Sequence, residues 1–354
     1  MGSEPDRVAG LDPERVARWL TGTVDALVGP VRFELVAGGR SNLTFRVTDA
    51  AGTGYALRRP PTGGVLSTAH DMAREWRFLT ALAPTPVPVP RPVAFCADPD
   101  VTGAEFYLME FVEGTVPADA AAGAALGPAA CARAGEQTVD VLVELHALDP
   151  ARTGLGDLIR RTGYLQRQLR RWHAQLHASA DRLPRLAADL ALLDEVHDLL
   201  LAHVPPQRTG IVHGDYRPGN AVFGPDGTLR AVLDWELATT GDPMADLAWL
   251  ISGWPDPGED LVPTTSGPST APGFPRRAEL VRRYADRSGR DVADLPYWTA
   301  FARWRAACIS AGVQARYLAG HMADDGHLIE ARARAEHVTQ LGRSARSALR
   351  DAGI

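Results

Sequence analysis

One short segment, IVHGDYRPGN at residues 211–220, brings together several groups that could take part in catalysis. Asp215 and Asn220 lie five positions apart, and Asp234 follows fourteen positions later at the end of the apolar run AVLD. Phosphoryl transfer needs a carboxylate near the acceptor hydroxyl and hard oxygen ligands that hold Mg²⁺ against the nucleotide phosphates. The segment therefore predicts Asp215 as a general base and Asn220 and Asp234 as magnesium ligands.

The residues between these groups favour a tight loop. The D-x-x-x-x-N spacing is the one that kinase catalytic loops use. Gly214 allows a sharp turn after the apolar pair at 211–212, Pro218 and Gly219 restrict the loop, and His213 is expected to brace it with a buried hydrogen bond. Taken singly, an Asp after a strand is most often a turn or cap residue and a lone His a satisfied core group. The combination HGD-x4-N with a later Asp is far more specific.

Composition narrows the possible functions. The chain has 354 residues, enough for two lobes, and a formal net charge of −6. All 37 basic residues are arginine, so a Walker A lysine, a Schiff base and a lysine general base are excluded. A GC-rich coding bias explains most of this arginine usage. The acidic balance offers no basic field for nucleic acid, so the expected partner is a small molecule.

Nothing in the sequence predicts export or membrane insertion. Cys96, Cys131 and Cys308 are far apart and form no C-x-x-C pair, which indicates ordinary buried thiols. The first ten residues lack signal-peptide features, and no run of about 18 apolar residues occurs. The expectation is a cytoplasmic protein with no membrane partner, either a monomer or a homodimer.

The first third of the chain predicts a small sheet. Residues 12–28 have apolar side chains at helical spacing after an Asp-Pro start. Between residues 31 and 112, five segments alternate apolar and polar side chains, and a helix with a possible capping box at Thr68 and Asp71 follows the third segment. The strands are VRFELV, TFRVTD, YALRR, VAFCAD and EFYLMEFVEG; the helix is STAHDMAREWRFLTAL; and PTPVPVPRP is expected to be extended.

The remainder predicts a mostly helical region. Helical periodicity covers 128–148, 161–180, 186–203, 276–288, 291–319 and 325–350, and the short runs IV, AVF and LRAVL read as strands. Residues 254–275 have no periodicity, which predicts a functional or poorly ordered loop. The predicted organisation is an N-terminal helical extension at 1–30, a nucleotide-binding lobe at 31–112, a hinge at 113–117 and a helical lobe at 118–354.

The segments HGDYRPGN and VLDWELATTGDPMADLAW resemble the catalytic and metal-binding motifs of the aminoglycoside phosphotransferase family, which shares the protein-kinase-like fold with choline kinases. These two segments are most similar to those of the subfamily that includes the kinase domains fused to acyl-CoA dehydrogenases in animals. The resemblance extends over roughly residues 30–320 and is strongest at 211–254. It implies a two-lobed α+β fold with a five-stranded antiparallel N-lobe that carries one helix, followed by a mostly helical C-lobe.

The resemblance also implies a site for ATP or GTP together with Mg²⁺. GGRSN at 38–42 corresponds to the loop over the nucleotide phosphates, although an ordinary hairpin turn explains this sequence when it is taken alone. The segment 108–112 joins the lobes and is implied to bind adenine through its backbone. The residues assigned in this way are Gly39, Ser41, Asn42, Met109, Glu110 and Val112.

Position 58 departs from the family pattern. Arg58 lies where the family usually has a lysine that contacts the phosphates, with Glu75 on the following helix as its implied ion-pair partner. A guanidinium is planar and larger than an ammonium group, so the two are not interchangeable. Arg59 is a weaker candidate for the same role. The departure leaves catalytic competence open.

Other positions are assigned to loop support and to acceptor binding. Asp246, at a predicted helix start, is expected to hold the loop by accepting backbone N–H bonds, and Asp242 is expected to cap the helix. An acidic cleft would suit a polycationic aminoglycoside, whereas the aromatic, Arg-bearing helix at 291–319 would suit an apolar or anionic hydroxylated metabolite. Trp304 on this helix could equally be a core residue of the helical lobe. The acceptor-binding candidates are Glu236, Trp304, Arg305 and Tyr317.

The sequence thus predicts an ATP-dependent phosphotransferase whose base is Asp215 and whose acceptor is an alcohol, either an aminoglycoside-like antibiotic or a hydroxylated metabolite or acyl compound. A catalytically weak nucleotide-binding regulator is the main alternative, because of Arg58. A metal-dependent hydrolase using His213, Asp215 and Asp234 is the weaker one, since no H-E-x-x-H motif accompanies them. A serine hydrolase is disfavoured because no G-x-S-x-G occurs.

Overall fold

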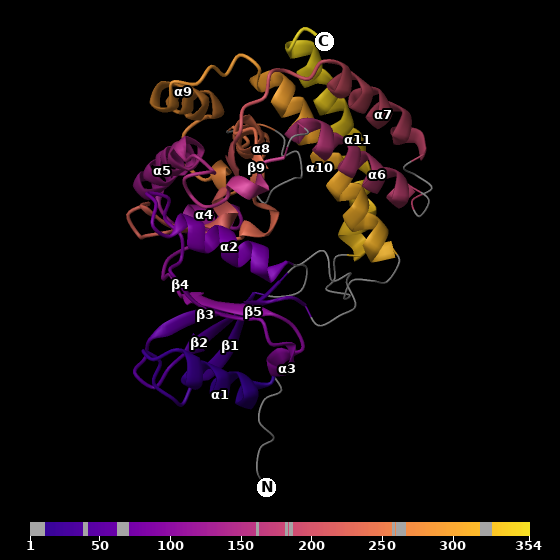
Figure 1. The fold of residues 1–354 in the computed structure, drawn as a ribbon. Helices are drawn as coiled ribbons and strands as arrows, with labels where there is room; N and C mark the ends of the chain where they lie inside the picture. The colour runs from indigo at the N-terminus through magenta and orange to yellow at the C-terminus, as the bar shows by residue number, and fades with distance from the viewer. Residues whose placement is uncertain are drawn as a thin grey trace. The chain divides into compact units, whose positions relative to one another are not determined.

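The structure is a computed structural model, and the chain divides into two compact units (Figure 1). Unit 1 comprises Met1–Glu113 and Ala231–Glu236, and unit 2 comprises Gly114–Arg230 and Leu237–Ile354. The residues that the structure describes are 11–37, 42–61, 71–160, 163–180, 183, 187–256, 259, 267–318 and 328–354.

Unit 1 is built on an antiparallel sheet with the strand order β1-β2-β3-β5-β4. A helix, α2, follows the third strand, so the predicted arrangement of five strands and one helix is confirmed. Asp12 and Asp71 cap α1 and α2 with their side chains; Thr68, the other half of the expected capping box, lies outside the described residues. The elements are α1 (Pro13–Thr23), β1 (Arg32–Ala37), β2 (Leu43–Thr48), β3 (Gly54–Arg59), α2 (Met72–Leu82), β4 (Pro92–Cys96), α3 (Pro99–Thr102) and β5 (Phe106–Glu110).

The sheet of unit 1 buries both of its faces. Phe106 and Leu108 of β5 join the cluster that contains the apolar side of α1, whereas Tyr107 and Met109 join the cluster that contains α2. This separation follows from the two-residue period of a strand. Figure 1 shows α1 and α2 on opposite faces of the sheet. The N-terminal helix, predicted as a separate extension, therefore contributes to the core of unit 1.

Unit 2 is mostly helical, as predicted. Its long helix α10 packs against α6, α7, α8 and α11, and Figure 1 shows α10 and α11 running side by side. Among the described residues no helix is both long and apolar enough to cross a membrane. The helices are α4 (Ala120–Ala125), α5 (Pro128–Ala147), α6 (Tyr164–Ala180), α7 (Ala187–Ala202), α8 (Met244–Ser252), α9 (Arg277–Ser288), α10 (Leu295–Leu318) and α11 (Leu328–Asp351).

Short strands flank the polar loop of unit 2. Strand β6 (Gly210–Val212) pairs antiparallel with β9 (Thr239–Gly241), and β7 (Ala221–Phe223) pairs with β8 (Leu229–Val232). The three predicted apolar runs form β6, β7 and β8, whereas β9 was not predicted. Within the expected loop at 254–275, residues 257–258 and 260–266 lie outside the described residues, and the described part contains a short 3₁₀ turn at Pro268–Thr270.

Candidate functional site

The loop at residues 213–220 leaves β6 through a turn that requires glycine. Gly214 has a φ of 86°, a region that favours glycine, and a Cβ at this position would lie 2.7 Å from the backbone oxygen of Leu237. The loop ends in a 3₁₀ turn at Pro218–Asn220, just before β7. Backbone geometry therefore fixes both ends of the loop.

Asp246 on α8 holds the start of this loop. Its carboxylate accepts the backbone N–H groups of His213 at 2.6 Å and of Gly214 at 2.8 Å. Burial raises the pKa of Asp246, but His146, whose Nε2 lies 3.5 Å from the carboxylate, and the N–H of Gly214 outweigh burial and leave the pKa below its ordinary value. Asp242, expected as a helix cap, accepts the N–H groups of Arg208 and Met244 instead and so links the approach to β6 with the start of α8.

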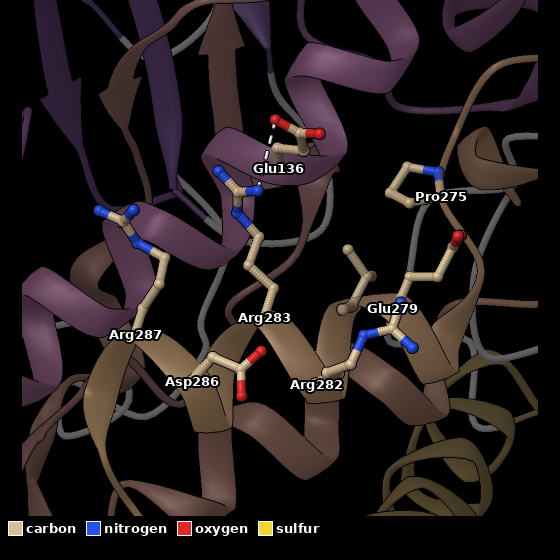
Figure 2. A pocket seen from close by; sticks show the side chains of 8 residues that line it. Glu136, Pro275, Glu279, Arg282, Arg283, Asp286 and Arg287 are labelled. Carbon is tan, nitrogen blue, oxygen red and sulfur yellow. Dashed lines mark ion pairs between the residues drawn. The ribbon is translucent and has the colours of Figure 1, made fainter.

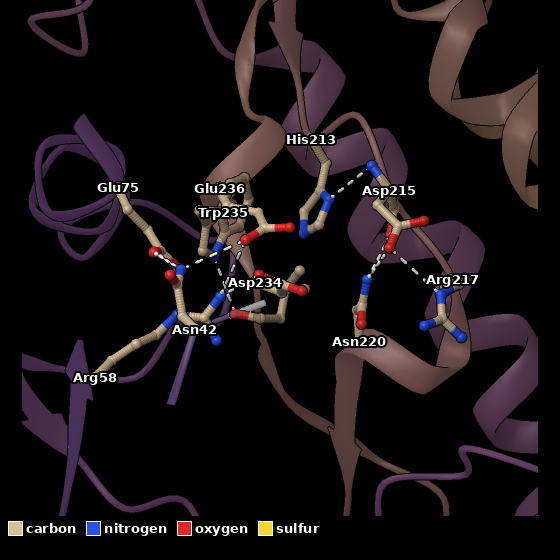
Figure 3. A network of polar contacts seen from close by, with 11 residues as sticks. Asn42, Arg58, Glu75, His213, Asp215, Arg217, Asn220, Asp234, Trp235 and Glu236 are labelled. Atoms are coloured by element: carbon tan, nitrogen blue, oxygen red, sulfur yellow. Dashed lines mark hydrogen bonds and ion pairs between the residues drawn. The ribbon is translucent and has the colours of Figure 1, made fainter. Parts of the chain in front are cut away.

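The carboxylate of Asp215 is held at both oxygens. Figure 3 shows Asn220 and Arg217 beside it. The indole Nε1–H of Trp249 donates to Oδ1 at 2.7 Å, and the Nδ2 of Asn220 donates to Oδ2 at 2.7 Å. Arg217 Nε lies 3.4 Å from Oδ2. With Nδ2 assigned to Asp215, the Oδ1 of Asn220 is on the other side of the amide and can serve as an oxygen ligand. Both groups of the D-x-x-x-x-N pattern thus meet within one loop.

His213 lies inside the loop. Its side chain is fully buried, and its Nδ1 accepts the backbone N–H of Asp215 at 3.2 Å. Because Nδ1 accepts this bond, the neutral ring carries its proton on Nε2, so neither nitrogen offers a lone pair to a metal. This position disfavours the hydrolase alternative.

Trp249 is a residue that the sequence analysis missed. It lies three positions after Asp246 on α8, so the two side chains share a face of that helix. The guanidinium of Arg305 lies over the Trp249 ring at 4.5 Å and donates from Nη2 to the backbone oxygen of Gly214 at 2.6 Å. Asp246 and Arg305 therefore contact the loop at adjacent backbone groups.

The acceptor-binding candidates on α10 are all buried. Trp304 is fully buried and its Nε1–H donates to the backbone oxygen of Leu193 at 2.9 Å, which is the contact of a core residue. Arg305 and Tyr317 are 4% and 3% exposed. Because the guanidinium of Arg305 bonds to the loop, its observed contacts are those of a supporting residue.

A second polar cluster, here called the Arg58 cluster, lies within unit 1 and consists of Asn42, Arg58, Glu75, Asp234 and Glu236 (Figure 3). Arg58 Nε lies 2.9 Å from Glu75 Oε1, and Arg58 Nη2 contacts Asp234 directly and lies 3.9 Å from Glu236. Asn42 Nδ2 donates to Glu75 at 3.3 Å and to Glu236 at 3.4 Å. Strand alternation explains the pairing, since Arg58 shares a face of β3 with Ala56, which packs in the α2 cluster.

The Arg58 cluster contains more acid than base. Burial lowers the pKa of Arg58, but Glu75 and Asp234 outweigh it and raise the pKa above its ordinary value. Burial raises the pKa of Glu75, and Arg58 offsets only part of this rise. With three carboxylates around one guanidinium, the cluster is short of positive charge.

Two observations indicate that the Arg58 cluster suits a divalent cation. Asn42 Oδ1 is buried and accepts no hydrogen bond within the described part of the chain. Asp234 has a φ of 64°, the one left-handed non-glycine conformation among the described residues, and such strain is concentrated at functional sites. A buried amide oxygen and excess carboxylates form the hard oxygen donor set that Mg²⁺ prefers.

The remaining nucleotide-site candidates lie on or beside the sheet. Met109 is buried in the α2 cluster, the side chain of Glu110 is half exposed, and Val112 is half-buried. Arg59, the weaker candidate for the lysine role, donates from Nε to the backbone oxygen of Pro60. Gly39 and Ser41 lie outside the described residues.

A pocket of about 410 Å³ lies between α5 and α9 in unit 2 (Figure 2). Charged side chains dominate its lining, and Arg283 pairs there with Glu136 at 3.5 Å and with Asp140 at 2.7 Å. None of the predicted site residues lines this pocket. The pocket is therefore not part of the candidate site.

Comparisons with known proteins identify the family of this chain. The sequence profile of the phosphotransferase enzyme family matches residues 32–295. Acyl-CoA dehydrogenase family member 11 of Gallus gallus is 34% identical over 317 residues, which cover 86% of this chain and 39% of that protein. The Homo sapiens protein of the same name is 34% identical over 293 residues, which cover 80% and 36%. The chain thus spans about two fifths of the length of these relatives.

Solved structures show the same fold. A candidate aminoglycoside phosphotransferase from Ralstonia eutropha has a TM-score of 0.77 at 32% identity, covering 95% of this chain and 98% of that one. Spectinomycin phosphotransferase in complex with ADP and spectinomycin has a TM-score of 0.63 at 11% identity, covering 96% and 98%. The predicted kinase-like α+β fold is confirmed.

Proposed function

Since the chain belongs to the phosphotransferase enzyme family, we propose that it transfers the γ-phosphate of ATP or GTP to a hydroxyl group of a small molecule, with Asp215 as the base. The observation that carries this proposal is the Asp215 carboxylate, which Trp249 and Asn220 orient near the start of an anchored loop. A carboxylate fixed in this way can accept the proton of an acceptor hydroxyl as the oxygen attacks phosphorus.

Asn220 and Asp234 are the proposed magnesium ligands. Asn220 offers Oδ1 because its Nδ2 is bound to Asp215, and Asp234 belongs to the cluster with excess carboxylate. When bound, Mg²⁺ neutralises charge on the nucleotide phosphates. Glu236, a candidate for acceptor binding by sequence, contacts Asn42 and Arg58, so its role in this proposal is to add negative charge beside Asp234 that a cation can neutralise.

Arg58 is proposed to hold a phosphate oxygen in place of the lysine that the family usually has. A guanidinium has five N–H donors. Glu75 and Asp234 are contacted through Nε and Nη2, which leaves further donors for phosphate. Glu75 and the strand position of Arg58 supply the orientation that a lysine–glutamate pair supplies in kinases.

The acceptor class is the open part of this proposal. The solved spectinomycin complex favours an aminoglycoside-like acceptor, whereas the names of the curated relatives favour a hydroxylated acyl compound. The buried positions of Trp304, Arg305 and Tyr317 remove the sequence argument for an acceptor pocket on α10. The acceptor therefore has to be identified by measuring turnover with different acceptors.

A panel assay tests the proposal. Purified protein is incubated with Mg·ATP or Mg·GTP and with aminoglycosides, hydroxyacyl compounds and simple sugars, and phosphorylated product is detected by mass spectrometry. The proposal expects acceptor-dependent product that disappears when Mg²⁺ is chelated. Tight nucleotide binding without turnover on any acceptor supports the second candidate, a nucleotide-binding regulator, which Arg58 favours. An Arg58→Lys variant with an unchanged KM for ATP would show that position 58 does not contact phosphate.

A further inference from the structure

Three metal-binding side chains converge in unit 2, on helices that the proposed chemistry does not use. His173 and His177 lie one turn apart on α6, and Asp194 lies on α7. The Nε2 atoms of both histidines lie 2.9 Å from the same oxygen, Asp194 Oδ1, and 3.1 Å from each other. We propose that His173, His177 and Asp194 form a binding site for a divalent transition metal ion of the zinc type.

The distances fit such an ion. Zinc binds histidine nitrogen at about 2.0–2.1 Å and carboxylate oxygen at about 2.0–2.2 Å, so ligand atoms at right angles lie about 3.0 Å apart and tetrahedral ones about 3.4 Å apart. The three observed separations of 2.9, 2.9 and 3.1 Å are at the short end of this range. An ion can therefore enter after shifts of a few tenths of an ångström.

Hydrogen bonding alone satisfies this arrangement poorly. If both histidines donate to Asp194, two N–H groups point at one oxygen with their nitrogens only 3.1 Å apart. If one histidine donates to the other, its partner has no proton on Nε2 and contacts the carboxylate with a lone pair. A cation accepts both nitrogen lone pairs and the carboxylate at once.

The site is accessible and its ligands are supported. The side chains of His173, His177 and Asp194 are 31%, 45% and 37% exposed, so an ion can enter from solvent and water can complete its coordination. His197 on α7 stacks on the His173 ring with centroids 4.0 Å apart, and the His197 ring in turn lies 5.6 Å from that of Trp304 in the core. Packing of this kind holds a ligand ring in its orientation.

A metal at this position would link α6 to α7. Both helices pack against α10, which carries Arg305. The expected consequence is stabilisation of unit 2 rather than a step in phosphoryl transfer. The inference is therefore independent of the proposed function, and either can fail without the other.

Titration with Zn²⁺ alone tests the site. Tag-free protein is stripped with a chelator, dialysed into buffer with excess Mg²⁺ and titrated with zinc chloride by calorimetry. One zinc per chain is expected, with a rise in Tm of about 4 °C at a free zinc concentration about 100 times the Kd. Cobalt substituted for zinc should give visible absorption bands that report nitrogen and oxygen ligands.

Variants assign the binding to these residues. His177→Gln and Asp194→Asn should each weaken zinc binding at least about tenfold and remove the rise in Tm. His203→Gln, an exposed histidine elsewhere after α7, is the matched control and should bind as the wild type does. Because the metal-free variants are compared with metal-free wild type by Tm, a folding defect is recognised separately. Zinc affinity that is the same in wild type, His177→Gln and Asp194→Asn, or no zinc binding to the wild type, would overturn the proposal.

Discussion

The loop at 213–220 and the Arg58 cluster are both polar and largely buried, but they are held in different ways. In the loop, Asp246 and Arg305 bind backbone groups, so the position of Asp215 depends on the main chain. In the Arg58 cluster, the contacts join one side chain to another, and acids outnumber the single base. The first region fixes a geometry, whereas the second leaves a charge that a ligand can satisfy.

Removing the base of the Arg58 cluster should give the largest loss of stability. Arg58→Ala leaves Glu75 and Asp234 without their cation, and loss of one partner from a buried ion pair costs about 3–5 kcal/mol. The free energy of unfolding is measured by urea denaturation, with the exposed Arg32→Ala as the control. Adding Mg²⁺ should recover part of the loss in the Arg58→Ala variant. A loss no larger than that of Arg32→Ala would contradict the importance of the ion pairs.

Asp246→Asn should damage the loop in a different way. The amide keeps one acceptor oxygen for two backbone N–H groups, so stability should fall by about 1–3 kcal/mol. Because the loop shifts with its backbone, kcat should fall more than nucleotide affinity does. Asp291→Asn is the control, since Asp291 also accepts a backbone N–H but is exposed. Equal losses in kcat and in nucleotide affinity would show that the two regions are not held independently.

Trp249→Phe tests the orientation of the base alone. The ring is kept beneath Arg305, but the Nε1–H donor to Asp215 is lost. The carboxylate then loses one of the two hydrogen bonds that orient it, so kcat should fall about tenfold while the Kd for Mg·ATP stays at the wild-type value. Trp254→Phe removes an indole donor to the backbone oxygen of Pro275 in the same unit and should leave kcat unchanged. A wild-type kcat in Trp249→Phe would show that Trp249 does not orient the base.

Buried His146 should make the free energy of unfolding depend on pH, with a smaller effect than the substitutions above. Burial lowers the pKa of His146, and Asp246 offsets only part of this effect. Below pH about 6.5 the unfolded chain takes up this proton more readily than the folded chain, so stability should fall with decreasing pH, by at most about 1.4 kcal/mol per unit. His146→Gln should flatten this part of the urea-unfolding profile, measured with a chelator present, whereas His203→Gln should not.

The sequence predicts those parts of the fold that have a clear period. The alternation in β2 and β5 and the 3.6-residue spacing in α5 and α10 identify these elements, and the D-x-x-x-x-N spacing predicts the loop in which the side chains of Asp215 and Asn220 meet. Strand β9 was not predicted, because its sequence TTG is short and has no alternation of apolar and polar side chains. A periodic pattern also does not reveal which partner a long side chain contacts. The sequence analysis therefore assigned Arg305 to acceptor binding, whereas its guanidinium binds the backbone of the loop.

Contacts between segments that are distant in the sequence are also not revealed by the sequence. Trp249 reads as an ordinary core aromatic until the fold brings it to Asp215. Likewise, His173 and His177 read as a solvated face of an Arg-rich helix, because their partner Asp194 lies on the next helix. Such pairs depend on tertiary packing, which no local pattern encodes.

The most direct test of the central claim compares turnover with nucleotide binding in Asp215→Asn. If Asp215 is the base, kcat on the best acceptor should fall by about 10²–10⁴-fold, while the Kd for Mg·ATP, measured by calorimetry, stays at the wild-type value. The exposed Asp25→Asn should change neither quantity. An Asp215→Asn variant that keeps the wild-type kcat would contradict the account.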